Sequence, residues 1–566
     1  MSQPEQRPLA EVEGIKAASH RLRGTIEEGL RDEATGAIAD ADTQLTKFHG
    51  IYQQDDRDLR TERQQQRLEP AHSFMVRVRV PGGVCSAPQW LAMDRLAREH
   101  ANGTLRLTTR QAFQFHGVIK RRLKPTIAAI NAALLDTIAA CGDVNRNVMS
   151  SPNPELSALH EETWRVACRI SERLTPRTRA YHEMWLDGEK LPASGEEEEP
   201  LYGPTYLPRK FKIGIAVPPW NDVDVFTQDL GFIAVSEQGR LVGFNVVAGG
   251  GMGATHGEPE TYPRLGDVIG FCTIEQAVNV AWQVVSIQRD FGDRTNRKHA
   301  RFKYTIADRG LAWFKSELEG RLGHALNAAQ EFRFLSSGDR YDWSKGLDGR
   351  WHLTLHVPSG RLADTPGRTL LSGLRDIAQV HGGRFRLTPN QNVIVAGVRE
   401  ADKARIEVLA RRHGLLHDQL PSALRREALS CVALPTCALA MAEAERYLPN
   451  LAGKLETRLA TLGLLDEPIT LRVTGCPNGC ARPYVAEIAL VGKGPGRYNL
   501  FLGGGFSGER LNRLVLENVD EDTILAALEP LLAAYASERS PGERFGDFLH
   551  RSGRLEDPVD ASRAQA

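Results

Sequence analysis

Four of the eight cysteines in this chain of 566 residues lie in two close pairs. Cys431 and Cys437 are separated by five residues, and Cys476 and Cys480 by three. Four thiolates can hold a tetrahedral zinc ion or a [4Fe–4S] cluster, because both need soft anionic ligands. Structural zinc favours tighter pairs than the first of these, so the spacing favours a cluster, with zinc and ordinary buried thiols left open as alternatives.

The residues around the second pair suit a backbone that folds tightly around an inorganic group. Gly475 and Gly479 add no side chains that would collide with such a group, and Pro477 and Asn478 are typical turn residues. The remaining cysteines are scattered, and we interpret them as structural: Cys85, Cys141, Cys168 and Cys272.

A large part of the sequence is present twice. Segment 106–117, RLTTRQAFQFHG, returns at 386–397 as RLTPNQNVIVAG, and segment 75–83, MVRVRVPGG, returns at 353–360 as LTLHVPSG. Two copies predict a pseudo-twofold arrangement, in which a ligand can bind at the interface of the halves.

Only one copy has the cysteines of a cluster. Aligning Pro152 with Pro435 places Val148 and Pro154 opposite the first cysteine pair. Neither residue can ligate iron, so the sequence predicts a single cluster, in the second copy.

Cations are concentrated in and near the repeated blocks. Arg77 and Arg79 alternate with valines, which predicts a half-buried strand with a cationic face, and Lys210 and Lys212 alternate in the same way. The set also includes Arg106, Arg110 and Arg146. A single arginine is usually a solvated surface charge, whereas cations that converge on a partly desolvated cavity bind a polyanion or a small oxyanion through charge-assisted hydrogen bonds.

Two uncharged polar residues extend this set. Gln114 and His116 share one face of the strand expected at QAFQFHG, with Phe113 and Phe115 on the other. They could line the same cavity, and a structural histidine is the alternative for His116.

Predicted strands alternate with helical periodicity, which indicates an α+β fold of two related halves. The segment Thr273 to Gln276 forms a capping box and predicts a helix that continues to about Arg289. The first 65 residues are polar and hold too little apolar material for a core of their own. They are predicted to form an extended arm lying on another surface, with a disordered tail as the alternative.

Composition excludes some classes of protein. The 71 Lys and Arg residues balance 71 Asp and Glu residues, so the net charge gives no support to a nucleic-acid or anionic-membrane partner. The N-terminus lacks the basic and apolar regions of a signal peptide, and no apolar run is long enough to span a membrane. A cytoplasmic location is therefore expected.

The cysteine blocks, together with the repeated halves, resemble those of the sirohaem-dependent sulfite and nitrite reductases. The blocks are SCVALPTCALAMAEAERYLP and RVTGCPNGCARPYVAEIALVGKGPGRYNLFLGG. Three further segments are most similar to the haemoprotein subunits of NADPH-dependent assimilatory sulfite reductases: KFHGIYQQDDRDLRTERQQQRLEP, YLPRKFK and GERFGDF. The resemblance runs from about Leu22 to about Val559.

This resemblance implies a domain order. Each half would consist of a ferredoxin-like half domain followed by a sirohaem/Fe–S-type α+β domain. The implied ranges are 1–67 for the N-terminal arm, 68–138 and 336–405 for the ferredoxin-like half domains, 139–335 for the larger domain without a cluster, and 420–566 for the larger domain with the ligands.

The resemblance also implies roles for individual residues. The [4Fe–4S] ligands would be Cys431, Cys437, Cys476 and Cys480, with Cys480 also bridging to the sirohaem iron. The catalytic cations would be Arg77, Arg146, Lys210 and Lys212. Sirohaem carries eight carboxylates, and its binding residues would be Arg106, Arg110, Gln114, His116, Lys303, Asn478 and Cys480.

The implied activity is the six-electron reduction of sulfite to sulfide in cysteine biosynthesis. Electrons would come from NADPH through a separate flavoprotein carrying FAD and FMN, in a hetero-oligomer, because this chain has no GxGxxG dinucleotide motif in a βαβ context. One alternative is a ferredoxin-dependent reductase of sulfite or nitrite. A second, non-enzymatic alternative is a four-cysteine zinc protein that binds nucleic acid, against which the zero net charge weighs.

Overall fold

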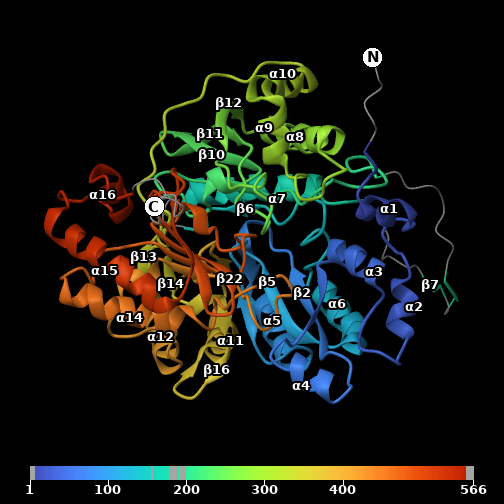
Figure 1. The fold of residues 1–566 in the computed structure, drawn as a ribbon, viewed down its shortest axis with the longest axis horizontal. Coiled ribbons are helices and arrows are strands. Elements are labelled where there is room, and N and C mark those ends of the chain that lie inside the picture. Colours follow the sequence, from blue (N-terminus) through green and yellow to red (C-terminus); the bar gives the residue numbers. More distant parts are fainter. Residues whose placement is uncertain (1–6, 154–156, 178–184, 187–188, 191–198, 556–566) are drawn as a thin grey trace, which may run out of the picture.

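The computed structural model describes residues 7–153, 157–177, 185–186, 189–190 and 199–555. Figure 1 shows the two copies as separate groups of elements around a shared centre. No helix in these described ranges is long and apolar enough to cross a membrane.

Two five-stranded antiparallel sheets form the centre, and each borrows its last strand from the other half of the chain. The first has the order β1 (Ile51–Asp55), β2 (His72–Val78), β5 (Phe113–Val118), β4 (Leu105–Leu107) and β15 (Arg361–Leu362). The second has the order β13 (Asp342–Lys345), β14 (Trp351–Leu355), β19 (Val393–Val398), β18 (Arg384–Leu387) and β3 (Val84–Ser86). Neither sheet is complete without the other copy.

The two central sheets share one hydrophobic core, which extends across both copies. Helices α5 (Ala87–Glu99) and α11 (Leu370–Val380) pack against each other in it. Trp90 on α5 is fully buried, and its ring stacks on Phe385 of the other half with centroids 4.6 Å apart. Helices α6 (Leu123–Ala132) and α12 (Glu400–Arg412) complete this layer.

Two further five-stranded sheets also match strand for strand. One has the order β12 (Asp267–Thr273), β11 (Arg240–Ala248), β10 (Leu230–Glu237), β9 (Ile213–Ala216) and β6 (Met149–Ser150). The other has the order β20 (Ala428–Ser430), β21 (Leu471–Thr474), β22 (Ile488–Gly494), β23 (Arg497–Leu502) and β24 (Arg513–Val519). The duplicated α+β fold expected from the sequence is therefore confirmed.

Helices cover these outer sheets. With the first lie α7 (Ser157–Arg173), α8 (Ala277–Phe291), α9 (Phe302–Arg309) and α10 (Leu311–Leu322). With the second lie α14 (Leu448–Thr461), α15 (Glu521–Glu538) and α16 (Phe545–Arg551), drawn in orange and red in Figure 1. Short elements connect the larger ones: α13 (Ala423–Arg426), and the ribbons β7 (Trp185–Leu186) with β8 (Glu189–Lys190) and β16 (Asp364–Thr365) with β17 (Arg368–Thr369).

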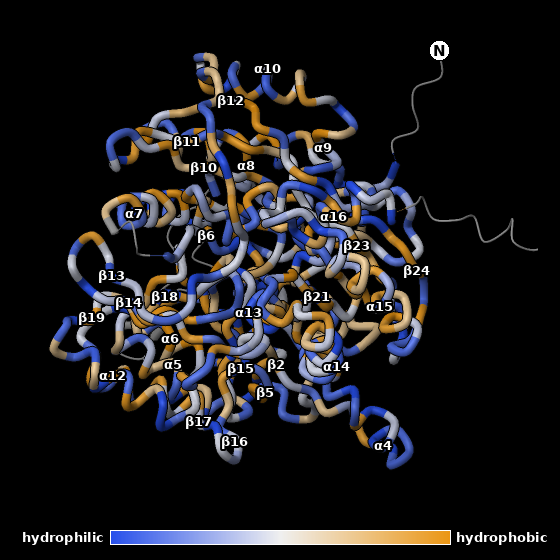
Figure 2. The backbone as a smooth tube through the Cα atoms, turned by 90° about the vertical axis from the view of Figure 1, so that its left-hand side faces the viewer, coloured by the Kyte–Doolittle hydropathy of each residue, from blue (hydrophilic) through white to orange (hydrophobic). Residues whose placement is uncertain are grey.

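The N-terminal segment packs on its own chain. It contains α1 (Glu11–Ala18), α2 (Ile26–Arg31), α3 (Asp40–Leu45) and α4 (Arg60–Gln65). Lys16 is buried, and its Nζ donates to the carbonyl of Leu207 at 2.9 Å and pairs with Glu13 at 2.5 Å. Strand β1 adds to the edge of the first central sheet. Helix α4 buries no residue, and Figure 2 shows it projecting as a mostly hydrophilic segment.

A buried ion cluster joins the two outer domains. Asp224 accepts from Arg472 Nη1 at 2.7 Å and from Arg482 Nε. The strand registers place Asp224 and Arg482 at equivalent positions of the two copies, and both have left-handed backbone, with φ of 47° and 53°. Burial acts to raise the pKa of Asp224, but the two guanidinium groups outweigh it and lower the pKa.

Three local expectations are corrected. Helix α8 begins at Ala277, because Thr273 is the last residue of β12 and its N–H donates to Gln276 Oε1 at 2.9 Å in a turn. Lys210 and Lys212 precede β9, so they do not lie on a strand. Strand β2 ends before Arg79, whose guanidinium pairs with Asp136 at 2.6 Å.

The alignment of the copies near the first cysteine pair also changes. Gln111 Oε1 accepts from Ser150 N at 2.9 Å, and its counterpart Gln391 accepts from Ser430 N at 3.4 Å. Ser150 and Ser430 are therefore equivalent, and the residue that corresponds to Cys431 is Ser151, not Val148. Pro154, the expected counterpart of Cys437, lies outside the described residues. The absence of a cysteine opposite Cys431 is unaffected.

Asp224→Ala should destabilise the junction of the copies strongly. The substitution leaves two buried guanidinium groups without their carboxylate, which costs about 3–5 kcal/mol. Denaturant unfolding followed by circular dichroism should show the loss. Arg446→Ala, which breaks exposed pairs with Asp58 and Glu443, is the control and should cost less than about 1 kcal/mol. Equal effects of the two substitutions would contradict this role of Asp224.

Candidate functional site

The two cysteine pairs are brought together by the strands that precede them. Cys431 directly follows β20, and Cys476 comes two residues after the parallel strand β21. Gly475 N–H donates to Cys431 Sγ at 3.3 Å, which fixes one loop against the other. Burial raises the pKa of Cys431, and the other three thiols of the set raise it further, so all four lie within electrostatic range of one another.

The loops around these thiols leave no room for extra side chains. A Cβ on Gly475 would lie 2.6 Å from the carbonyl oxygen of Ala442, and one on Gly492 would lie 2.5 Å from that of Gly475. Asn478 Nδ2 approaches Cys476 Sγ at 3.6 Å. Backbone and amide donors aimed at sulfur, with glycine where the chains meet, fit the ligand shell of an iron–sulfur cluster.

A single zinc ion would need a tight group of ligands. Ligands to one zinc ion must all approach it within about 2.0–2.3 Å, so their donor atoms lie close together. Among the described residues, no group of three or more His, Cys, Asp or Glu side chains is placed to hold one metal ion. Four thiols within electrostatic range of one another can hold a cube of iron and sulfide.

A row of polar side chains crosses the first central sheet next to these cysteines. Arg77 on β2 is the cross-strand partner of Gln114 on β5, which is also the partner of Arg106 on β4. With its amide oxygen turned toward Arg77, Gln114 accepts from Nε at 3.2 Å and Nη2 at 2.5 Å. The alternation expected from the sequence therefore places cations and an amide on one face.

Arg77 and Arg146 share a neighbour that the sequence analysis interpreted as structural. Arg77 Nη1 donates to Cys141 Sγ at 2.9 Å, and Arg146 donates to the carbonyl of the next residue, Gly142, at 3.1 Å. Tyr52 of β1 adjoins both: burial raises its pKa, and the Cys141 thiol raises it further. The N-terminal segment thus closes this side of the site.

The two lysines lie near Cys480. Lys210 and Lys212 are half-buried, and their ammonium groups make no hydrogen bond or ion pair in the part of the chain that the structure describes. Burial lowers the pKa of Lys210 to about 7, and neighbouring Arg209, Arg301 and Arg146 add to this. Cys480 acts in the other direction on both lysines, so its thiol lies within electrostatic range of the two ammonium groups.

Several residues predicted to line a cofactor have buried polar atoms without a partner. His116 is buried with both ring nitrogens unbonded, and burial lowers its pKa well below the ordinary value. The Nε atoms of Arg106 and Arg110 are also unbonded. Unpaired buried donors are costly, so these groups await a ligand that accepts hydrogen bonds. A polycarboxylate tetrapyrrole fits that requirement.

Other N–H groups of the residues predicted to bind the cofactor already have hydrogen-bond or ion-pair partners within the protein. Arg106 Nη1 pairs with Glu445 at 3.0 Å, and Arg110 Nη2 donates to the carbonyl of Ile213 at 2.8 Å. Lys303 Nζ donates to the carbonyls of Gly251, Gly253 and Tyr262, which ties down the glycine-rich loop. That loop adjoins the second cysteine pair, because Ala254 N–H donates to Pro477 O at 2.9 Å.

Sequence reasoning missed Arg301. Its guanidinium pairs with buried Asp229 at 2.9 Å and depresses the pKa of Lys210. It stands alone before α9, with no alternating pattern or repeat block to mark it. Cys141 and Tyr52 were missed for a similar reason, since only their tertiary contacts distinguish them.

Comparison with known families agrees with this architecture. Residues 165–326 and 423–556 match the nitrite and sulphite reductase 4Fe-4S domain, and residues 66–133 and 344–410 match the nitrite/sulfite reductase ferredoxin-like half domain. The chain belongs to the nitrite and sulphite reductase family. The resemblance seen in the cysteine blocks is confirmed, and the domain that contains all four clustered cysteines is one named for its 4Fe-4S group.

Curated relatives match over nearly the whole chain. The sulfite reductase [NADPH] hemoprotein beta-component of Myxococcus xanthus (strain DK1622) is 62% identical over 98% of both chains. The protein of the same name from Shouchella clausii (strain KSM-K16) is 58% identical over 96% of both. The solved structure of the Mycobacterium tuberculosis NirA protein aligns with a TM-score of 0.78 at 25% identity, covering 96% of each chain.

Lys210 should titrate near neutrality. Its pKa of about 7 leaves the amine uncharged, and therefore reactive, at pH 8, whereas an ordinary lysine of pKa about 10.4 stays protonated. Competitive acetylation of the cofactor-free chain, read by mass spectrometry of the Lys210 peptide, should give a midpoint near pH 7. A midpoint above about 9 would show that this ammonium group is solvated.

Proposed function

We propose that this protein is the haemoprotein subunit of a cytoplasmic NADPH-dependent sulfite reductase and reduces sulfite to sulfide. The observation that carries the proposal is the position of Cys480. Its sulfur belongs to the four-thiol group and also lies within electrostatic range of Lys210 and Lys212. Cys480 can therefore connect the group that delivers electrons with the cations that bind the substrate anion.

Cys431, Cys437, Cys476 and Cys480 would hold the [4Fe–4S] cluster, with Cys480 shared with the sirohaem iron. The tetrapyrrole would be bound by Arg106, Arg110, Gln114, His116, Lys303 and Asn478. When bound, these coupled groups supply the electrons of the reaction. The orphaned nitrogens support this assignment, since the Nε–H groups of Arg106 and Arg110 and the one N–H of the neutral His116 ring each need an acceptor.

The catalytic cations act on the substrate oxygens. Conversion of sulfite to sulfide takes up six electrons, breaks three S–O bonds and releases three water molecules, so two protons must reach each departing oxygen. Arg77 and Arg146 hold the anion through charge-assisted hydrogen bonds, and Cys141 orients Arg77. Lys210 can give up and regain a proton near neutral pH because burial lowers its pKa to about 7.

The electron donor is proposed to be a flavoprotein subunit with FAD and FMN that takes electrons from NADPH. The names of the Myxococcus and Shouchella relatives, which describe one component of an NADPH enzyme, support this partner. Steady-state assays should show sulfide production with NADPH plus the flavoprotein and little with ferredoxin. The reverse preference would favour the ferredoxin-dependent alternative.

Cys480→Ser should lose the cluster and the sirohaem together, because one sulfur serves both. Iron and acid-labile sulfide analysis and the visible absorption spectrum measure the two losses separately. Cys168→Ser, which changes a half-buried cysteine outside the cluster set, is the matched control and should keep both groups. A Cys480→Ser protein that retained either spectrum would exclude the shared ligand.

Lys210→Ala should keep both cofactors and slow turnover by about 10²–10³, the effect of removing one preorganised donor from a transition state. Lys210→Arg restores the positive charge but supplies no proton near pH 7. It should therefore recover sulfite affinity more than kcat. Unchanged kinetics in Lys210→Ala would remove this residue from the site.

A further inference from the structure

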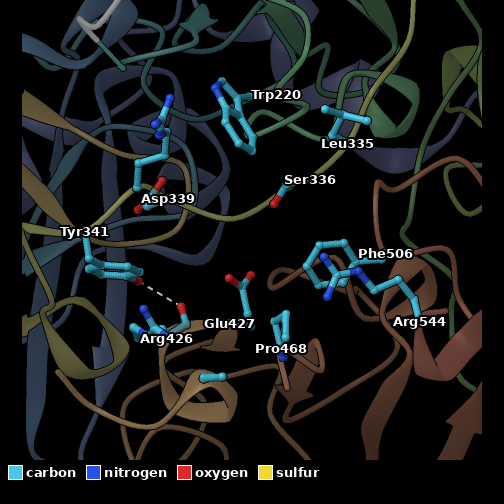
Figure 3. A pocket seen from close by; sticks show the side chains of 12 residues that line it. Trp220, Leu335, Ser336, Asp339, Tyr341, Arg426, Glu427, Pro468, Phe506 and Arg544 are labelled. Atoms are coloured by element: carbon cyan, nitrogen blue, oxygen red, sulfur yellow. Dashed lines mark hydrogen bonds between the residues drawn. The ribbon is translucent and has the colours of Figure 1, made fainter. Parts of the chain in front are cut away.

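A cavity of about 460 Å³ is lined by residues of both copies and by none of the four clustered cysteines. We call it the second chamber. Its walls come from both copies, as Figure 3 shows: Trp220, Leu335, Ser336, Asp339, Arg340, Tyr341, Ala423, Arg426, Glu427, Pro468, Phe506 and Arg544.

The second chamber occupies the position that corresponds to the catalytic site. Strand β6 pairs with β9 in the first copy in the same register as β20 pairs with β21 in the second copy. Arg146 and Arg426 precede the matched residues of β6 and β20 by the same number of positions, so they are equivalent. The same registers place Pro468 opposite Lys210. Arg544 is the residue before α16, as Arg301 is the residue before α9. The duplicated fold thus forms a chamber twice, with different side chains.

The substitutions remove the redox apparatus from the second chamber. Asp222 stands at the position of Cys480, and its carboxylate is bonded to Ser151 Oγ at 2.5 Å. Trp220 stands at the position of Asn478. The lining of the second chamber therefore contains no thiol for a metal and has an aromatic ring, Trp220, in place of an amide.

Two cations of the second chamber are left without partners. Within the described residues, neither Arg426 nor Arg544 makes an ion pair, and Arg426 Nε is buried with no hydrogen bond. Their guanidinium groups lie over aromatic rings, Arg544 at 4.2 Å from the Phe506 centroid and Arg426 at 5.9 Å from that of Tyr341. Stacked, preorganised guanidinium groups are well suited to bind an oxyanion.

Cavity volume argues for more than a bare inorganic ion. A water molecule takes up about 30 Å³ in the liquid, so 460 Å³ exceeds what a sulfate or phosphate ion fills and falls within the range of small-molecule sites. The lining also includes Trp220 and Phe506, and a guanidinium group lies over each ring: Arg340 at 5.0 Å from the Trp220 centroid and Arg544 over Phe506. The rest of these rings offers flat apolar surface.

We propose that the second chamber binds a small organic anion, whose oxyanion group is held by Arg426 and Arg544 and whose flat apolar part packs on Trp220 and Phe506. The binding is separate from sulfite reduction and does not depend on the proposed activity.

Glu427 gives this binding a pH dependence. It projects into the cavity between Tyr341 and the Phe506–Arg544 pair in Figure 3. Burial raises its pKa to about 7; Asp339 and Glu487 act in the same direction, and Arg426 and Arg472 oppose them. The other charged or titratable groups of the lining are Arg340, Tyr341 and Arg544. Below pH 7 the neutral carboxyl can donate to the anion, whereas above pH 7 its charge repels it.

Calorimetric titration of the holoenzyme with naphthalene-2-sulfonate tests the proposal, with excess sulfite present to occupy the catalytic site. One binding event is expected, weakened at least tenfold by Arg426→Ala and by Arg544→Gln and unaffected by Arg446→Ala. Affinity should rise as pH falls from 8 to 6, and Glu427→Gln should remove that dependence. Dye-driven sulfite reduction by Arg426→Ala should stay unchanged.

Three outcomes would overturn the proposal. They are no binding at millimolar probe, equal binding by all variants, and tighter binding of a naphthylmethylammonium cation at high pH, which would make Glu427 a cation site. Because the assay needs no turnover, a failure of the proposed sulfite reductase activity would leave its result interpretable.

Discussion

The buried contact of Asp224 with Arg472 and Arg482 is the interaction on which the arrangement of the two copies depends. A carboxylate without solvent is tolerated only when cations satisfy it, so the outer domains cannot separate without exposing an unpaired charge. Asp224 and Arg482 occupy equivalent positions, so one duplicated locus has acquired opposite charges. Because the charges are opposite, an outer domain of the first copy pairs better with one of the second copy than with another of its own kind.

The same duplication explains how one fold supports one reactive centre. The paired registers of the outer sheets would form two equivalent chambers if the sequences were identical. Cys476 and Cys480 stand opposite Pro218 and Asp222, and Lys210 stands opposite Pro468. One chamber therefore gathers thiols and ammonium groups, and the other keeps arginines, carboxylates and aromatic rings.

The sequence predicted features that depend on local pattern. Spacing identified the four cysteines, and alternation identified the face shared by Arg77 and its neighbours, because both signals lie within a few residues. It did not predict the contact of Arg77 with Cys141, the place of Arg301 or the second chamber, since these depend on residues brought together from distant segments. The helix expected directly after Thr273 begins only at Ala277, because β12 extends through Thr273, although the Thr273 N–H still donates to Gln276 as in a capping box.

The exchange of edge strands has a consequence for how the polypeptide is made. Strand β15 completes a sheet whose other members lie between residues 51 and 118, so that sheet keeps an open edge until more than 240 further residues have left the ribosome. An exposed edge of this kind invites pairing with other nascent chains. Synthesis of this protein therefore places a demand on chaperones that its final, closed form conceals.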